Sequence, residues 1–572
     1  MHAPPAGGAD DALRRAELQA LAFAPAPGPG RADLAAAPPV RGTRPLRVRV
    51  HRNHGFELAV PPLEWFLGYA GYAPEAWIGG YDDSLAFGEL AGEADVEVVW
   101  VDPARYASRL APAEVSALVG ARVAALRERS AAPILVPVLD DPAWDLPALE
   151  GAIGRVAGAH PLPLAALQQA LGPRFLDPRA AALTGTRLSG PALVQVARLL
   201  AFRWIPASVT AGIKAIALDL DQTLYRGVLG EDGVQGVELT PAHAALQRDL
   251  VALQERGILL AVASRNEAED ARALLATRED FPLRAAHLSA SAVSWGPKAQ
   301  GLAEVARQLR IAPDAILFVD DNPGELAAVA SELPGIRTLY ASADAEATRR
   351  ALALWPGLFR WAVDETDRLR SADLRASEER AALAARAADP GDYLRALGAA
   401  LTFAVNPARD ARRLYEMSHK TNQFNLALAR LPEAEVARRV AGREGGAVSV
   451  RLRDRLSDSG VVASVLARRD HDGGGEVLVV DELCISCRAL GRQLEDLMVG
   501  GAVRLLLGQH PARRVRFVHA TGPRNAPARE WLARFAGVAA LGAEGALELP
   551  AERFAGYGPD GGHPVTIEVA HG

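Results

Sequence analysis

Two aspartates follow a short apolar stretch in the middle of the chain. Residues 213–218 are rich in branched apolar side chains, which predicts a buried strand, and the sequence DLDQT (219–223) ends it. Because side chains two residues apart in an extended chain point to the same side, Asp219 and Asp221 present two carboxylates together. Open α/β sheets bind their ligands at this end of the strands. Two like charges so close need a cation or a shared proton, and Mg²⁺ prefers carboxylate and phosphate oxygens.

Further polar residues follow in a fixed order. Residues 258–263 and 315–319 are two more apolar strands, and a lysine begins a helical pattern between them. A lone DxDxT is a weak signal, and ordinary surface polar residues would explain each motif singly, but the combined order favours a site. The residues are Ser264 after the second strand, Lys298 in the sequence WGPK, and Asp320 and Asp321 after the third strand.

This order of four motifs resembles the haloacid dehalogenase superfamily of phosphotransferases. The resemblance implies that Asp219 attacks phosphorus and forms an aspartyl-phosphate, which splits one hard displacement into two easier ones. Asp221 would protonate the leaving oxygen and then take a proton from the attacking water. Ser264 and Lys298 would hold the phosphoryl oxygens and offset the charge that develops on them.

The same resemblance implies the ligands of a magnesium ion. Asp219, the carbonyl of Asp221 and Asp320 would bind Mg²⁺, and Asp321 would do so directly or through water. Asn266 fits a supporting role in the second motif, and helix capping fits it equally well.

Length and composition describe a globular protein of several domains. The chain has 572 residues, a net charge of −6, 49% hydrophobic and 23% charged residues, and two cysteines. The acidic balance argues against nucleic-acid binding, and no apolar run approaches the ~18 residues of a membrane span. The acidic start does not resemble a signal peptide, and two cysteines give no disulfide framework. We expect a cytoplasmic protein with no membrane partner.

The pattern predicts an α/β, three-domain chain. Residues 1–44 are rich in Pro and Gly after one short helix and suggest a flexible arm. Strands and helices alternate over 45–210 and 211–370, which predicts Rossmann-like parallel sheets in the first two domains. Residues 371–390 suggest a linker helix, and 391–572 a mixed α+β domain.

The first domain, 45–210, has little that predicts catalysis. Its arrangement resembles the SGNH hydrolases, but the loop after its first strand reads HRNHG (51–55), without a serine nucleophile. Asn53 and His54 would be able to touch a ligand, although a structural or docking role is the better interpretation.

The second domain lacks room for a cap. Between its first two motifs lie only a hairpin-like flap, Tyr225–Leu239, and one helix, whereas a cap domain needs about 50 residues or more. The site is therefore expected to be open, which suits a phosphoryl group on a large partner or a long carrier arm.

Longer segments narrow the resemblance to the FkbH-like, capless subfamily IIIC. They are YRGVLGEDG (225–233), WGPK (295–298) and VDDNP (319–323). The family also ends in a domain similar to GNAT acetyltransferases, with TNQFN and SCRxLGR segments. In its RxxGR loop Arg488, Gly491 and Arg492 would bind the pyrophosphate of coenzyme A or the phosphopantetheine of a carrier protein, although Gln493 replaces the usual small residue.

The two cysteines, Cys484 and Cys487, have CxxC spacing without a second pair, so zinc is improbable and a buried structural thiol is the default. Cys487 is the better functional candidate, because Arg488, Arg492 and a helix start favour a thiolate, which would accept an acyl group.

FkbH-like proteins take the glyceryl unit of 1,3-bisphosphoglycerate, remove its phosphate and load it onto an acyl-carrier protein for polyketide or non-ribosomal peptide biosynthesis. Some hold glyceryl on a cysteine near the second motif, where this chain has Ala263. A thioester here would therefore form on Cys487 or Cys484, or transfer would be direct. The alternatives are a phosphatase fused to an acyltransferase for another small molecule or sugar, and a non-catalytic scaffold.

Overall fold

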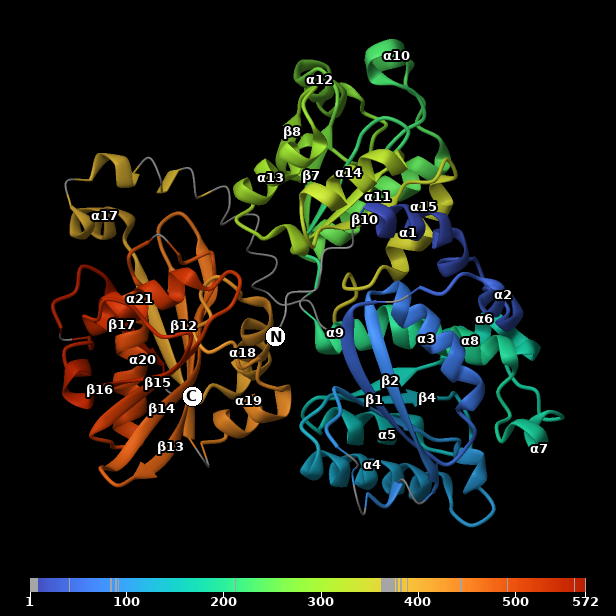
Figure 1. Ribbon diagram of the computed structural model, residues 1–572, viewed down its shortest axis with the longest axis horizontal. Helices are drawn as coiled ribbons and strands as arrows, with labels where there is room; N and C mark the ends of the chain where they lie inside the picture. Colours follow the sequence, from blue (N-terminus) through green and yellow to red (C-terminus); the bar gives the residue numbers. More distant parts are fainter. Residues whose placement is uncertain are drawn as a thin grey trace. The chain divides into compact units, whose positions relative to one another are not determined.

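The structure is a computed structural model that describes residues 9–40, 42–82, 85–87, 90, 92–210, 212–361, 376, 379–380, 383–387, 389–442, 445–490, 492–559 and 561–570. It contains two parallel sheets of five strands and one mixed sheet of seven (Figure 1). One compact unit ends at Trp361 and holds the two parallel sheets, and the other follows it and holds the mixed sheet. The predicted fold class is confirmed.

The first sheet has the strand order β2-β1-β3-β4-β5, and all its strand pairs are parallel. The alternating pattern over 45–210 predicted a parallel sheet of this kind. The strands at its two edges, β2 and β5, are less buried than the fully buried β3 and β4 between them. The strands are β1 (Arg44–Arg52), β2 (Tyr72–Tyr81), β3 (Val96–Trp100), β4 (Ile134–Val138) and β5 (Ala159–Pro163). The helices are α3 (Val60–Tyr69), α4 (Pro112–Arg129), α5 (Leu146–Gly154), α6 (Ala165–Leu171), α7 (Ala181–Thr184), α8 (Gly190–Leu199) and α9 (Ile205–Val209).

The second sheet has the order β10-β9-β6-β7-β8 and is also parallel throughout. Its central strand is β6, the strand that the DLDQT sequence ends, and β6 is fully buried. The strands are β6 (Ala215–Leu218), β7 (Leu259–Ser264), β8 (Leu288–Val293), β9 (Ile316–Asp320) and β10 (Arg337–Tyr340). The helices are α10 (Leu229–Gly236), α11 (Pro241–Glu255), α12 (Ala268–Thr277), α13 (Lys298–Gln308), α14 (Pro323–Glu332) and α15 (Ala345–Leu354).

The N-terminal segment is folded where the structure describes it, so the prediction of a flexible arm is wrong for these residues. It forms α1 (Ala9–Ala22) and α2 (Arg31–Ala36). The Gln19 amide pairs with the backbone of Tyr340 on the edge strand β10, donating at 2.7 Å and accepting at 3.0 Å. The Phe23 ring lies 5.1 Å from that of Phe202 and 5.7 Å from that of Trp355. The Pro- and Gly-rich composition suggested a flexible tether, because contacts between a short helix and residues far along the chain leave no pattern in the local sequence.

The third sheet has the order β16-β15-β14-β13-β12-β11-β17, with antiparallel and parallel pairs. Alternate residues of its strands enter two apolar clusters, one covered by α17, α20 and α21 and the other by α18 and α19. Its strands are β11 (Ala400–Val405), β12 (Gly445–Arg453), β13 (Asp458–Asp472), β14 (Gly475–Ile485), β15 (Arg514–Ala520), β16 (Glu544–Pro550) and β17 (Thr566–Ala570). Its helices are α17 (Pro390–Leu397), α18 (Ala411–Lys420), α19 (Glu433–Val440), α20 (Glu495–Gln509) and α21 (Ala526–Ala536).

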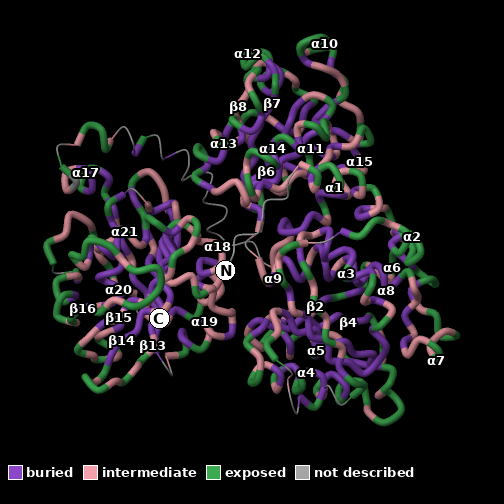
Figure 2. Tube along the Cα trace, in the orientation of Figure 1, coloured by how far each residue is buried: buried purple, intermediate pink, exposed green. Residues whose placement is uncertain are grey.

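Two predictions fall partly outside the described residues. Half of the predicted linker helix, 371–390, lies there, and so do residues 1–8 of the predicted arm. Pro390, predicted to end the linker helix, instead begins α17, where proline lacks only an N–H that would be unpaired anyway. Among the described residues one helical stretch, Gly190–Val209, is long and apolar enough to cross a bilayer, but 78% of its most apolar window is buried inside the protein, as in a core helix. Figure 2 shows the buried residues gathered in the strands of both units.

Candidate active site

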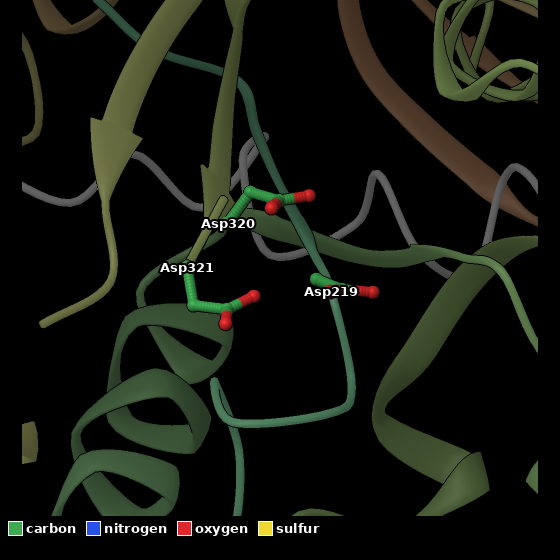
Figure 3. Close-up of side chains that lie close together, drawn as sticks. All are labelled: Asp219, Asp320 and Asp321. Atoms are coloured by element: carbon green, nitrogen blue, oxygen red, sulfur yellow. The ribbon is translucent and has the colours of Figure 1, made fainter. Parts of the chain in front are cut away.

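Three carboxylates meet at the carboxyl ends of two adjacent strands. Strands β6 and β9 pair in parallel, and Asp219 donates its backbone N–H to Val319 O at 2.9 Å, which places the two strand ends side by side. One oxygen from each of Asp219, Asp320 and Asp321 lies within 4.8 Å of the other two. Figure 3 shows the three side chains directed into one space. The structure thus brings these three residues, named by the sequence analysis, to one place.

The cluster is buried and its charges are not balanced. Asp219 is 5% exposed and Asp320 is fully buried. Burial, followed by the charge of Asp219, raises the pKa of Asp320 to about 6, and the same two causes raise the pKa of Asp321. Lys298 Nζ lies 2.9 Å from Asp219 Oδ2 and 2.6 Å from Asp320 Oδ2. Burial by itself would lower the pKa of Lys298, but these carboxylates outweigh it and raise that pKa. One ammonium therefore faces three carboxylates.

The residues fit a magnesium ion. Asp219 Oδ1 is buried and has no hydrogen-bond partner, which is a costly arrangement unless something binds there. Carboxylate oxygens are the ligands Mg²⁺ prefers, and a dication would offset the repulsion among the three acids. The Asp221 carboxylate, which the sequence predicted beside that of Asp219, is not part of this group of three and instead accepts a hydrogen bond from the Tyr225 hydroxyl at 2.6 Å.

Asp221 and Ser264 form a second part of the site, joined by Asn266. Asp221 accepts hydrogen bonds from the Tyr225 hydroxyl at 2.6 Å and from Leu229 N at 2.9 Å. Asn266 Nδ2 donates to Asp221 Oδ2 at 3.0 Å and to Ser264 Oγ at 3.1 Å. The capping position of α12 belongs to Glu267, so the supporting interpretation of Asn266 is the one its contacts favour.

The region between the first two motifs is short, as predicted, but its form differs. The ends of the predicted hairpin do pair, with Arg226 opposite Glu238. Its tip is the helix α10 rather than a turn, interrupted at Gly233, whose φ of 68° breaks the helical path. The ends of the predicted hairpin-like flap therefore pair as expected, and the helix at its tip is the part that the prediction did not include. Trp295, three residues before Lys298, is 65% exposed and donates from Nε1 to Glu267 Oε1 at 2.7 Å.

In the third domain the predicted cofactor-binding arginines are buried. Arg492 donates to Asp454 Oδ2 at 2.8 Å and to Ser459 Oγ at 2.9 Å, and Arg380 contacts the same carboxylate at 2.9 Å. Arg488 is 7% exposed. Gly491 lies outside the described residues. The following helix carries the acidic side chains Glu495 and Asp496 in its first turn, and these would repel a pyrophosphate there. The geometry thus disfavours the coenzyme A role predicted for this loop.

The two cysteines differ in exposure. Cys484 is the last residue but one of β14, is fully buried, and donates from Sγ to Glu482 Oε1 at 3.1 Å. Burial, the Glu482 charge and this hydrogen bond raise the pKa of the Cys484 thiol well above its ordinary value. Cys487 lies two residues beyond the strand and is half-buried. The structure therefore gives Cys484 the features of a structural thiol and leaves Cys487 as the more accessible sulfur.

The end of the TNQFN segment (421–425) lies between two strands. Strands β14 and β15 pair only over Val477–Val480, and beyond this the segment Phe424–Leu426 lies between them. Leu426 N donates to Leu483 O at 3.1 Å, and Ala520 N donates to Leu426 O at 3.0 Å.

The polar residues of the first domain are paired with one another. His54 shares a 3.0 Å hydrogen bond with Thr186 Oγ1. Asn53 donates to Asp102 O at 3.0 Å and accepts from Asp102 N at 2.8 Å. Arg187 grips the Asp102 carboxylate with two hydrogen bonds, at 2.8 and 2.9 Å. These contacts agree with the predicted structural role of Asn53 and His54.

The sequence matches no known family model and no curated protein. Solved structures give partial likenesses. The N-terminal part of BF1531 from Bacteroides fragilis, which contains a phosphatase domain and was crystallised with Mg, is 19% identical, with a TM-score of 0.45 over 60% of this chain and 98% of that one. CbbY from Rhodobacter sphaeroides, in complex with phosphate, is 18% identical, with a TM-score of 0.18 over 22% and 84%. A fungal multi-domain GH3 β-N-acetylglucosaminidase with a GCN5-related glucosamine N-acetyltransferase region is 13% identical, with a TM-score of 0.16 over 93% and 67%. Likenesses this weak carry no argument about activity or substrate.

Proposed function

We propose that this protein is a magnesium-dependent phosphatase and acyltransferase of the haloacid dehalogenase type. The observation that carries the proposal is the group of Asp219, Asp320 and Asp321 beside Lys298, with Asp219 Oδ1 buried and unpartnered. This arrangement supports an enzyme over a scaffold, because a scaffold gains no stability from burying three carboxylates that repel one another.

The chemistry follows from the two parts of the site. Asp219 would attack phosphorus, so that a new P–O bond forms as the bond to the leaving oxygen breaks. Asp221 would donate a proton to that oxygen and later accept one from water as the water oxygen bonds to phosphorus. Inorganic phosphate then leaves and Asp219 is restored.

The surrounding residues would supply charge and orientation. Lys298 and Ser264 would contact the phosphoryl oxygens, where positive charge and a hydroxyl donor stabilise the transition state. Asp219, Asp320 and Asp321 would hold Mg²⁺, which supplies further positive charge for the phosphoryl group.

For the substrate we propose a phosphoglyceryl donor, 1,3-bisphosphoglycerate, and an acyl-carrier protein as acceptor. The carrier's phosphopantetheine thiol would attack the acyl-phosphate carbonyl on carbon 1, so that a C–S bond forms as the C–O bond to phosphate breaks, and the phosphate on carbon 3 would be the one that Asp219 removes. Support comes from the FkbH-like segments of the sequence and from the short α10–α11 connection, which provides no cap domain over the site. A site without a cap would admit a phosphopantetheine arm carried by a protein. The alternative, a coenzyme A-dependent acyltransferase in the third domain, has weaker support because Arg492 is committed to Asp454.

The test is to incubate the protein, Mg²⁺, 1,3-bisphosphoglycerate and a phosphopantetheinylated carrier, then weigh the carrier by mass spectrometry and measure phosphate release. We expect a glyceryl adduct and free phosphate. Asp219→Asn should lose phosphate release by a factor of about a thousand or more, as expected when a nucleophile is removed. The matched control is Asp249→Asn, a half-exposed aspartate paired with Arg349, which should retain the wild-type rate.

The outcomes separate the parts of the proposal. A carrier of unchanged mass with phosphate still released would reject glyceryl loading and retain the phosphatase. Full phosphate release by Asp219→Asn would reject the phosphatase as well. Cys487→Ala that loads the carrier at the wild-type rate would reject a thioester on Cys487.

A further inference from the structure

The Asp221 carboxylate is held from three sides by its own chain. Its Oδ1 accepts from the Tyr225 hydroxyl at 2.6 Å and from Leu229 N at 2.9 Å, and its Oδ2 accepts from Asn266 Nδ2 at 3.0 Å. A carboxylate oxygen offers about two acceptor positions. Oδ1 therefore has both of its positions filled, whereas Oδ2 keeps one. Oδ2 is the atom left to give or take a proton.

Asn266 couples this carboxylate to the phosphate-binding hydroxyl. A carboxylate accepts only, so the amide nitrogen of Asn266 must face Asp221, and its second hydrogen reaches Ser264 Oγ at 3.1 Å. Because the Ser264 oxygen accepts this bond, its own hydrogen is available for a phosphoryl oxygen. Asn266 and Ser264 are each 3% exposed, so water competes little for these bonds.

The two donors to Asp221 Oδ1, Tyr225 and Leu229, are also held in place. The Tyr225 side chain is fully buried and its ring lies 5.9 Å from that of Phe281. Burial and the hydrogen bond to Asp221 raise the pKa of Tyr225, so its hydroxyl stays protonated and donates. Leu229 is the first residue of α10, so the backbone of the flap supplies the remaining donor.

We propose that Tyr225 and Asn266 are positioning residues that hold Asp221 Oδ2 as the proton-transferring atom, so that this uncapped site has its acid–base group in place without the closure of a lid. Asn266 in addition orients the Ser264 hydroxyl toward the phosphoryl group. The inference rests on the proposed phosphatase function and goes beyond it by assigning the atom and the groups that fix it.

The test compares two substrates that differ in their need for a proton. Glycerol 3-phosphate releases an alkoxide that requires protonation, whereas p-nitrophenyl phosphate releases a stable phenolate. The parameter kcat/KM covers the steps through transfer to Asp219 and excludes the later attack of water. With Mg²⁺ present, Tyr225→Phe should lower kcat/KM for glycerol 3-phosphate about tenfold more than for p-nitrophenyl phosphate, because general acid catalysis is weakened only where it is needed.

Two further variants complete the design. Asn266→Ala should show the same preferential loss and also a higher KM for both substrates, because Ser264 loses its orienting partner. Tyr69→Phe is the matched control, since it also removes a buried hydroxyl, one that donates to Arg15 O at 3.1 Å outside the site. It should leave the ratio of the two kcat/KM values at the wild-type level.

Equal losses on both substrates in Tyr225→Phe and Asn266→Ala would overturn the positioning role while leaving the phosphatase intact. Failure of the wild-type protein to hydrolyse either substrate would overturn the phosphatase proposal and this inference together. Hydrolysis that continues at the wild-type rate in Asp219→Asn would do the same. Circular dichroism of each variant shows whether a loss reflects folding, and Asn266→Ala decides the matter where Tyr225→Phe does not fold.

Discussion

The two parallel sheets of the first compact unit carry polar residues at equivalent positions, but these residues are paired in one sheet and partly unpaired in the other. In each sheet, polar side chains follow the central strands at their carboxyl ends, where open α/β sheets bind ligands. After β1 and β3 they are Asn53, His54 and Asp102, and after β6 and β9 they are Asp219 and Asp321, with Asp320 as the last residue of β9. Location within the fold therefore does not distinguish the two groups.

The two groups differ in whether their polar atoms have hydrogen-bond and charge partners. In the first sheet the Asp102 carboxylate faces Arg187, and the His54 ring stacks on Trp100 with 4.7 Å between ring centroids. In the second sheet Asp219 Oδ1 has no partner, and burial together with a neighbouring carboxylate raises the pKa of Asp320 to about 6. A folded chain keeps such uncompensated charge at a cost in stability, which is why it marks a functional site more reliably than polarity does.

The largest expected contrast comes from removing one carboxylate from each sheet. Asp320→Asn should lower magnesium-dependent phosphate release by about a hundredfold or more, since a ligand and a Lys298 contact are lost. Without Mg²⁺ at pH 8 the same variant should unfold at a higher temperature. A raised pKa means that the ionised carboxylate costs free energy in the folded state, about 1.4 kcal/mol for each unit.

Asp102→Asn should do the opposite. It removes the carboxylate that Arg187 grips, and we expect a loss of roughly 1–3 kcal/mol in stability, reduced from the value of a fully buried pair because Arg187 is 20% exposed and also contacts Asp141. Phosphate release per folded molecule should not change. Thermal unfolding and phosphate release measured on both variants test the comparison, which fails if the two midpoints shift in the same direction.

A smaller effect is expected from the ion itself. Mg²⁺ should raise the unfolding midpoint of the wild-type protein, because binding to the folded state alone stabilises it by about 2.7 kcal/mol at one hundred times the dissociation constant. The ion should shift Asp320→Asn much less and Asp102→Asn as much as the wild type. Equal shifts in all three proteins would place the ion away from Asp219, Asp320 and Asp321.

The acidic cluster was predictable because its determinants are local. Each residue follows an apolar run directly, and parallel strands bring such ends to one edge, so strand order together with the family resemblance predicted Asp219 beside Asp320. Asn266 carries a similar signal, since it stands two residues after Ser264, the spacing that also relates Asp219 to Asp221. Tyr225 carried none, because its hydroxyl reaches Asp221 only through the turn that the chain makes after β6.

The third domain shows what sequence patterns leave out. The loop around Arg488 and Arg492 resembles an anion-binding loop, yet Arg492 is neutralised by Asp454, which stands 38 positions earlier in the chain. No local pattern reveals a partner so distant, because the sequence around a basic residue in a loop is the same whether or not that residue is paired. The edge strands β2 and β5 give no clear strand signal for a different reason: they are only partly buried, so they lack the continuous apolar run of a central strand such as β3.

The last prediction concerns the pH dependence of the satisfied sheet. Burial lowers the pKa of His54 to about 3, and the charges of Arg105, Arg187 and Arg52 add to this effect. Below the ordinary histidine pKa of about 6.5, His54 binds a proton in the unfolded chain but not in the folded chain. The stability contributed by neutral His54 is therefore complete above pH 6.5 and decreases by about 1.4 kcal/mol for each unit of pH below it.

Unfolding midpoints at pH 7.5 and 5.5 measure this slope. His54→Phe keeps a ring against Trp100 and removes the titrating nitrogen, so it should lose part of the wild-type pH dependence even if it is less stable at pH 7.5. His471→Phe, at a side chain that is 71% exposed, should keep the wild-type slope. An identical slope in His54→Phe and the wild type would mean that His54 binds a proton as easily in the folded protein as in the unfolded chain. The contrast between the paired polar groups at the strand ends of the first sheet and the unpaired ones of the second would then no longer hold.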